Sequence, residues 1–189
     1  SLHKKYNINK NQKIILFATG KLQPFYSSHG KYDYDVKIWE NLLNNYKNDK
    51  DIFLILKPHP TEKNISDYEN LISKFSVSNA RIIDDDLFEL LFISSTIITV
   101  FSSVMIDSLC LKKSVIRIKF PGDVNSIFDE SNAVITTDID SLHSCITELF
   151  SSKQLSRNLE INSEKFVKNH YGIPENNPKN ILETIMESN

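Results

Sequence analysis

The feature that most constrains the fold is an alternation of short apolar runs with segments of helical periodicity along the chain. The apolar runs are rich in Ile, Leu, Val and Phe, and each is short enough for a strand. Six strands are predicted, over 13–18, 51–57, 80–83, 96–101, 114–120 and 133–137. Strands that alternate with helices form a parallel sheet covered by those helices. We therefore predict an α/β fold, with a parallel sheet of about six strands and helices on both faces.

The helices between these strands are recognised from apolar residues that recur every three or four positions. They are predicted over 33–46, 66–75, 87–92, 102–111, 138–150 and 155–170. Gly172 follows the last of them and is a candidate C′ glycine. We expect one of the three aspartates 84–86 to cap the helix that starts at 87, and the other two to lie in solvent.

Composition argues for a single domain that has no metal site and no surface for binding polyanions. The 189 residues carry 22 lysines and arginines against 24 aspartates and glutamates, and the two signs are interspersed. This balance argues against binding to nucleic acid or to a membrane surface. Cys110 and Cys145 lack the spacing of a zinc site or a disulfide framework. We expect no metal, no cofactor and a reducing, cytoplasmic setting.

The N-terminus and one uncharged stretch bear on location. Residues 1–12 are charged and lack the apolar core of a signal peptide, so we expect a flexible segment over 1–12 and a single domain over 13–189. Residues 90–106 carry no charge and approach the roughly 20 residues of a spanning helix, but serines and threonines interrupt them. A helix end, a strand and a helix start explain this stretch better than a transmembrane segment does.

Candidate site residues follow from the predicted sheet. In open parallel sheets, ligands bind outside the carboxyl ends of the strands, where the strand order reverses. The polar residues that follow the first, second and fourth strands are Thr19, Gly20, Lys57, His59, Ser102 and Ser103. A long polar loop follows Gly20 and contains His29, the one other histidine that we regard as a candidate.

His59 is held between two prolines directly after an apolar strand, in the sequence FLILKPHP. Pro58 and Pro60 fix their own φ angles and favour extended backbone at Lys57 and His59. An ammonium and an imidazole held in this way could neutralise a phosphate without a metal ion. A purely structural Pro-x-Pro turn is the alternative.

Ser102 and Ser103 lie where a strand turns into a helix, so their hydroxyls and the first N–H groups of the helix could bind phosphate. A plain serine N-cap is the alternative. Glycine-rich phosphate loops do not compete with this interpretation, because the first strand is followed by neither GxGxxG nor GxxxxGK[ST].

The order of three motifs carries a resemblance to a known group of enzymes. KPHP, then SSVMID some forty residues later, then LKKSVI, resemble the C-terminal, donor-binding half of GT-B fold transferases. The similar families are the HP/SS-motif sialyltransferases and polysialyltransferases, the capsule polysaccharide transferases and the CDP-glycerol glycerophosphotransferases. The resemblance implies a single Rossmann-like domain in which His59, Ser102 and Ser103 contact the donor phosphates. Asp107 stands where these families often have a longer glutamate that reaches the ribose, and Ser114 replaces their usual proline.

The resemblance also implies a function. The chain would be the donor-binding half of a glycosyl- or glycerophosphotransferase of cell-surface polysaccharide synthesis, with His59 as its catalytic residue. The substrate would be a nucleotide-activated sugar or polyol, of CMP or CDP type rather than UDP type. A polysaccharide or glycolipid acceptor would bind through an N-terminal domain that this chain lacks, and the full-length protein would be cytoplasmic and peripheral at the inner face of the membrane.

Two alternatives remain. One is a sugar-nucleotide 2-epimerase-like isomerase, a family that shares the architecture but carries a Ser-Gly-Gly turn and a double glutamate where this chain has Ser102-Ser103 and Asp107. The other is a non-catalytic, flavodoxin-like binding module, in which the strand-end residues would serve only as caps and turns.

Overall fold

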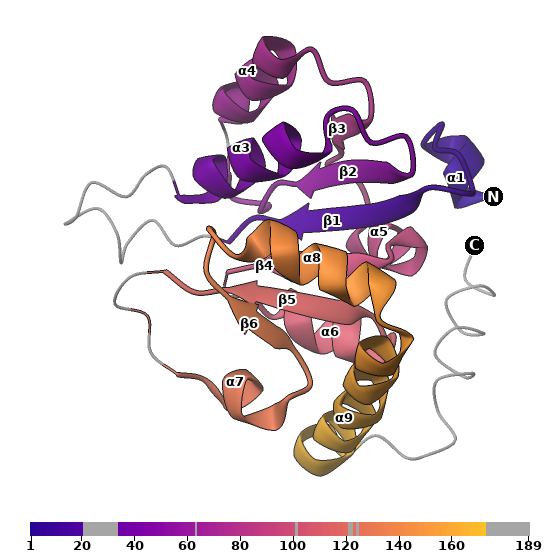
Figure 1. Cartoon of the computed structure of the whole chain (residues 1–189), viewed down its shortest axis with the longest axis vertical. Coiled ribbons are helices and arrows are strands. Elements are labelled where there is room, and N and C mark those ends of the chain that lie inside the picture. Colours follow the sequence, from indigo (N-terminus) through magenta and orange to yellow (C-terminus); the bar gives the residue numbers. More distant parts are fainter. Residues whose placement is uncertain (21–33, 63, 101, 121–122, 124, 173–189) are drawn as a thin grey trace.

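Six strands form one sheet whose neighbouring strands are all parallel (Figure 1). The computed structural model describes residues 1–20, 34–62, 64–100, 102–120, 123 and 125–172. The strands are β1 (Lys13–Ala18), β2 (Ile52–Lys57), β3 (Ala80–Ile82), β4 (Thr96–Thr99), β5 (Ser114–Ile118) and β6 (Ile135–Thr137). The predicted α/β fold with a parallel sheet is confirmed.

The central strands are apolar throughout because both faces of the sheet are covered. Side chains alternate between the faces of a strand. Ile15 and Phe17 of β1 accordingly pack in one core with α3, whereas Ile14 and Leu16 pack in a second core with α5. All four side chains are fully buried, which explains why β1 reads as a continuous apolar run and not as an alternating one.

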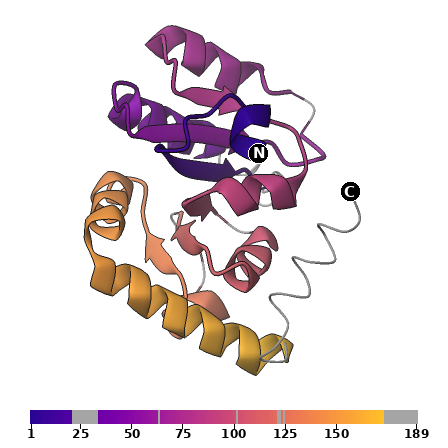
Figure 2. The same ribbon diagram turned by 90° about the vertical axis from the view of Figure 1, so that its right-hand side faces the viewer.

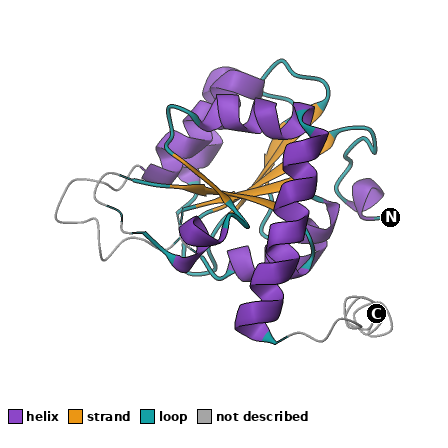
Figure 3. Cartoon of the chain, turned by 60° about the horizontal axis from the view of Figure 1, so that its bottom comes forward, coloured by secondary structure: helices purple, strands orange, loops and turns teal. Residues whose placement is uncertain are grey.

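Helices lie on both sides of the sheet, as Figures 2 and 3 show. The helices of the described residues are α1 (Leu2–Lys5), α3 (Tyr34–Tyr46), α4 (Ser66–Phe75), α5 (Leu87–Ile93), α6 (Val104–Cys110), α7 (Ile127–Ser131), α8 (Leu142–Ser151) and α9 (Lys153–Tyr171). Buried residues of α3, α4 and α8 share the first core. Those of α5 share the second core with Val104 of α6 and with residues next to α1. Leu159 of α9 belongs to the first core, while Phe166 packs with α6 and α7, so α9 contacts elements on both sides of the sheet.

The N-terminal segment differs from the expectation of a flexible tail. Residues 2–5 form α1, and Tyr6 and Ile8 are buried. The Tyr6 hydroxyl donates to Glu89 at 2.6 Å, and Lys5 forms ion pairs with Asp85 and Glu89. Burial of Tyr6 and Ile8 and these polar contacts hold the segment against α5, a long-range contact that the local composition does not reveal.

Several helix ends were predicted and others were missed. Asp86 caps α5 by accepting the backbone N–H of Glu89, and Gly172 ends α9 with φ +60°, as expected. Helix α4 has no side-chain cap, because Ile65 occupies its N-cap position. Helix α7 was not predicted because it is only five residues long. Across the described residues, no helix has both the length and the apolar character needed to cross a bilayer.

The strand order β3-β2-β1-β4-β5-β6 reverses direction between β1 and β4. This is the order of dinucleotide-binding sheets, in which the ligand crevice opens at the reversal. The carboxyl ends of β1, β2 and β4 therefore lie at one edge of the sheet, and the predicted site residues follow those three strands.

Candidate functional site

The His59 turn presents one ring nitrogen to its own loop and leaves the other available. Nδ1 of His59 accepts the backbone N–H of Thr61 at 3.2 Å and lies 2.9 Å from the Thr61 hydroxyl oxygen. Because Nδ1 is an acceptor in this arrangement, the neutral imidazole carries its proton on Nε2. The turn therefore offers an N–H donor on a ring held between two prolines.

Thr19 lies at the end of β1 and is buried, with its hydroxyl used within the protein. Its Oγ1 donates to Oε2 of Glu62 at 2.7 Å and accepts the backbone N–H of His59 at 2.8 Å. The backbone N–H of Thr19 also donates to the carbonyl of Lys57 at 3.1 Å. These bonds tie the end of β1 to the His59 turn, so Thr19 supports the turn in place of facing the crevice.

Lys57 is directed toward β3 and not toward the strand reversal. Its side chain is largely buried and forms an ion pair with Asp84, which follows β3. Asp85, the next residue, pairs with Lys5. Asp84 and Asp85 are both exposed to solvent, as expected, and each also forms an ion pair with a lysine from another part of the chain.

The two serines after β4 use their hydroxyls differently. Ser102 Oγ accepts the N–H of Val104 at 3.3 Å. Ser103 is the exposed N-cap of α6, yet its side chain makes no capping hydrogen bond. A plain serine cap was the alternative expected from the sequence, and the Ser103 hydroxyl does not have that role.

Asp107 lies one turn into α6 and is half-buried. Burial raises the pKa of its carboxyl above the ordinary value for aspartate. It lies four residues after Ser103, in the first turn of α6.

Two carboxylates that were not predicted from the sequence lie close to the carboxyl ends of β1 and β2. Asp35, in the first turn of α3, accepts the backbone N–H of Gly20, and Glu62 follows the His59 turn. Burial, together with the charge of Glu62, raises the pKa of Asp35 to about 7, while the bond from Gly20 opposes the rise. Oδ1 of Asp35 is buried and has no hydrogen-bond partner among the described residues. The only sequence signal for either residue was an acidic side chain beside a strand end.

Replacing Asp35 by asparagine should remove a pH dependence of stability. A carboxyl whose pKa is raised on folding binds more protons in the folded state, so it makes the wild type less stable as pH rises from about 4 to about 7. We expect the stability of Asp35→Asn relative to wild type to increase by about 1–3 kcal/mol between pH 5 and pH 8. Urea unfolding at the two pH values measures this difference. Parallel curves would contradict it, and Asp67→Asn on exposed α4 provides the control.

Arg117 forms a buried ionic cluster near the carboxyl end of β5. Its guanidinium donates to Asp123 at 2.6 Å and to Asp129 at 3.1 Å, and all three side chains are at most 10% exposed. Burial favours protonation of Asp129, but hydrogen bonds from Thr136 and Ser126 and the charge of Arg117 outweigh it and lower its pKa. A single arginine within an apolar strand was the available sequence signal for this cluster. The ion pair between Arg117 and Asp123 connects β5 to the loop that follows it.

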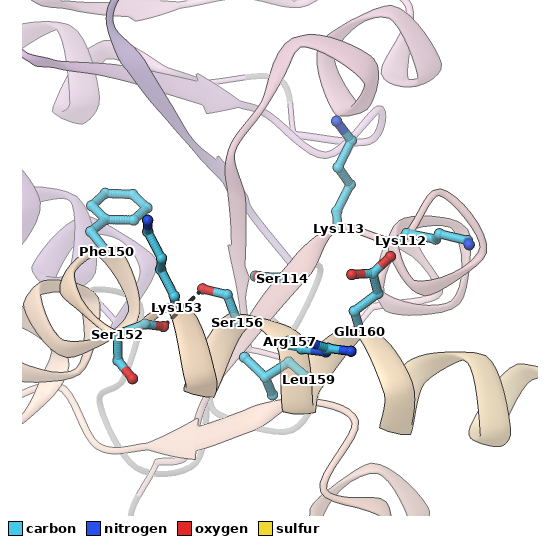
Figure 4. A pocket seen from close by; sticks show the side chains of 10 residues that line it. All are labelled: Lys112, Lys113, Ser114, Phe150, Ser152, Lys153, Ser156, Arg157, Leu159 and Glu160. Atoms are coloured by element: carbon cyan, nitrogen blue, oxygen red, sulfur yellow. Dashed lines mark hydrogen bonds between the residues drawn. The ribbon is translucent and has the colours of Figure 1, made fainter.

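A separate hollow of about 490 Å³ lies at the amino-terminal ends of the strands, where Ser114 begins β5 (Figure 4). Its lining includes Lys112, Lys113, Lys153 and Arg157. These cations do not converge: Lys113 reaches the carbonyl of Phe92, and Lys112 pairs with Glu164. In the part of the chain that the structure describes, no group of acidic, histidine or cysteine side chains could hold a metal ion.

The residues that follow β1, β2 and β4 lie at the carboxyl ends of neighbouring parallel strands, and their side chains differ in how they are engaged. Thr19 and Lys57 are engaged within the protein, whereas the Ser103 hydroxyl and Nε2 of His59 are not used by the helix cap or by the loop contacts described above. The loop containing His29 lies outside the described residues.

Comparison with solved structures supports the fold. The chain resembles the wall teichoic acid polymerase TagF, with a TM-score of 0.64–0.67 in two structures, 19–20% identity, and coverage of 99% of this chain and 46% of that one. It also resembles the UDP-GlcNAc 2-epimerase of Neisseria meningitidis bound to UDP-GlcNAc, with a TM-score of 0.64, 15% identity, and coverage of 91% and 48%. The GT-B Rossmann-like fold is confirmed, and the chain spans about half of each of these proteins.

Comparison of sequences identifies the family, which comparison of folds alone does not. A teichoic acid poly(glycerol phosphate) polymerase of Bacillus spizizenii is 33% identical over 120 residues, which cover 61% of this chain and 28% of that protein. Residues 1–123 match the family described as CDP-glycerol:poly(glycerophosphate) glycerophosphotransferase, and this range includes both the His59 turn and the two serines. Since the match covers 123 of 189 residues, the chain belongs to this family of transferases.

Proposed function

We propose that this chain is the donor-binding half of a glycerophosphotransferase of cell-surface polymer synthesis, and that its donor is a cytidine-linked polyol phosphate such as CDP-glycerol. The observation that carries the proposal is the His59 turn, which presents an Nε2–H at the sheet edge where Ser102 and Ser103 also lie. The family match and the printed name of the Bacillus relative support this donor class.

The proposed site suits the charge changes of such a transfer. An acceptor hydroxyl oxygen would attack the phosphorus of the glycerol phosphate group, and the bond from that phosphorus to the bridging oxygen of CMP would break. The leaving CMP carries the growing negative charge. His59 Nε2–H and the serine hydroxyls would stabilise that charge by hydrogen bonds, as oriented donors do when negative charge develops in a transition state.

Lys57 would contact the donor only after its ion pair with Asp84 breaks. Its ammonium is paired with Asp84, so it would contact a donor phosphate only by exchanging that carboxylate for the phosphate. Asp107 would reach toward the ribose as the resemblance implies. The binding site for the acceptor, and the group that removes the acceptor's proton, would be supplied by a second domain, because the chain spans only about half of the similar structures.

A nucleotide screen tests the proposal. We expect CMP and CDP, at about 100 times their Kd, to stabilise the purified chain by about 2.7 kcal/mol, which corresponds to a rise in Tm of about 5–10 °C. UDP, GDP and ADP should have smaller effects at equal concentrations. The variant Ser102→Ala/Ser103→Ala should lower the Tm of the free protein by only a few degrees, because one hydrogen bond to the Val104 N–H is lost, and should lose most of the cytidine response.

Each alternative gives a different pattern in this screen. A response to UDP alone would contradict the cytidine donor and favour the epimerase-like alternative, whose family shares the fold. No response to any nucleotide would contradict donor binding by this chain and favour a non-catalytic module. A cytidine response that survives the serine substitutions would contradict the assigned location.

A further inference from the structure

Glu62 forms the centre of a hydrogen-bond network that joins three elements behind the proposed site. Its Oε2 accepts the hydroxyl of Thr19 at 2.7 Å, and its Oε1 accepts the hydroxyl of Tyr68 at 2.7 Å. Thr19 follows β1, Tyr68 lies in α4, and Glu62 itself follows the turn after β2. The carboxylate therefore connects segments that are far apart in the sequence.

Glu62 is coupled to the main chain of His59 both through its carboxylate and through its own backbone. The His59 N–H lies 3.4 Å from Oε2 of Glu62, and the Glu62 N–H donates to the His59 carbonyl at 2.8 Å. The stronger bond from the His59 N–H goes to Thr19 Oγ1, at 2.8 Å. A threonine hydroxyl has one proton to donate, so giving it to Glu62 leaves a lone pair of Oγ1 for His59.

A negative charge at this position is unfavourable for binding an anion, and this excludes Glu62 as a phosphate ligand. The network explains why an acceptor is nevertheless required there. Two hydroxyl protons and one backbone N–H all point at Glu62, and an ionised carboxylate accepts on both oxygens whereas a glutamine accepts on only one. Burial and the bond to Glu62 raise the pKa of Tyr68, which keeps its hydroxyl proton in place.

We propose that Glu62 is a positioning residue of the donor site, whose carboxylate fixes the Thr19 hydroxyl and the His59 main chain so that the imidazole is held for the donor phosphate. This inference rests on the proposed function. It reassigns Thr19 from a donor contact to the link through which Glu62 acts. The phosphate itself is contacted by His59 and the serines, and not by Glu62 or Thr19.

Isothermal titration of CDP into the wild type, Glu62→Ala and Glu62→Gln tests the proposal. We expect Kd to rise about tenfold or more in Glu62→Ala. In Glu62→Gln the rise should be smaller, because the amide oxygen still accepts from Thr19 and the Tyr68 hydroxyl can accept from the amide nitrogen. Glu69→Ala removes an exposed carboxylate of α4 and should leave Kd unchanged. Circular dichroism confirms that each variant is folded at the titration temperature.

Unchanged or tighter CDP binding by folded Glu62→Ala would overturn the proposal, since loss of a carboxylate without loss of positioning should favour an anion. A second readout does not depend on nucleotide. Hydrogen exchange of the His59 amide should accelerate at least tenfold in Glu62→Ala relative to the amides of β2, and equal protection would also overturn the proposal. If wild type binds no nucleotide, the proposed function fails, and the exchange result alone decides whether Glu62 fixes the turn.

Discussion

Replacing His59 by alanine is expected to weaken CDP binding about 10- to 100-fold, because a hydrogen bond to a charged group contributes about 1.5–3 kcal/mol. The side chain is only partly buried and its described contacts are to Thr61 in the same loop. The free energy of unfolding should therefore change by no more than about 0.5 kcal/mol. Titration calorimetry with CDP and urea unfolding measure the two quantities on one preparation.

His143→Ala provides the matched control for this experiment. His143 lies on α8, and its ring contacts the Tyr46 hydroxyl at 3.1 Å. Its loss should lower stability slightly and leave CDP binding unchanged. Normal binding by His59→Ala would remove the imidazole from the proposed site, and a large loss of stability would show that the Pro-x-Pro turn is structural.

Arg117→Met should lower the free energy of unfolding by about 3–5 kcal/mol, the cost of leaving the partner charges of a buried ion pair without compensation. Asp123 and Asp129 are 7% and 10% exposed and would lose the guanidinium that lies between them. Methionine has a similar length and fills much of the same space, so the effect reports lost charge pairing more than a cavity. Urea unfolding at pH 7 measures the change.

Lys112→Met is the control for this prediction. It breaks an ion pair of similar length, 2.6 Å to Glu164, in which both side chains are about half exposed. Such surface pairs contribute about 0–1 kcal/mol because water and salt screen them. Equal losses in the two variants would contradict the assignment of Arg117 to a buried cluster and would point to a general effect of removing positive charge.

The fold was predictable because the signals that specify it are local. β1 was predicted with its observed bounds. A cap among the aspartates 84–86 and the C-terminal Gly172 were recognised from residue type and position alone. Five-residue α7 and the burial of Tyr6 were not predictable in this way. A short helix has too few turns to show periodicity, and Tyr6 is fixed by contacts with residues more than 70 positions away.

The site was predictable in outline but not in the roles of its residues. The sequence placed Thr19, Lys57 and His59 at strand ends, and the strand-end rule brought them to one edge. It could not show that Thr19 donates to Glu62 or that Lys57 pairs with Asp84, because each bond joins residues from different strand ends. Which side chains remain available to a ligand depends on these pairings, and they follow from the three-dimensional arrangement.

The lengths of the outermost strands have a consequence for behaviour at high concentration. β3 and β6 lie at the two edges of the sheet, and each is three residues long. An edge strand presents unpaired N–H and C=O groups to other molecules, and short edges present few of them. The long apolar strands that would be most prone to intermolecular pairing, β1 and β2, are enclosed by neighbours on both sides. The fold thereby limits sheet-to-sheet aggregation in a chain whose central strands are strongly hydrophobic.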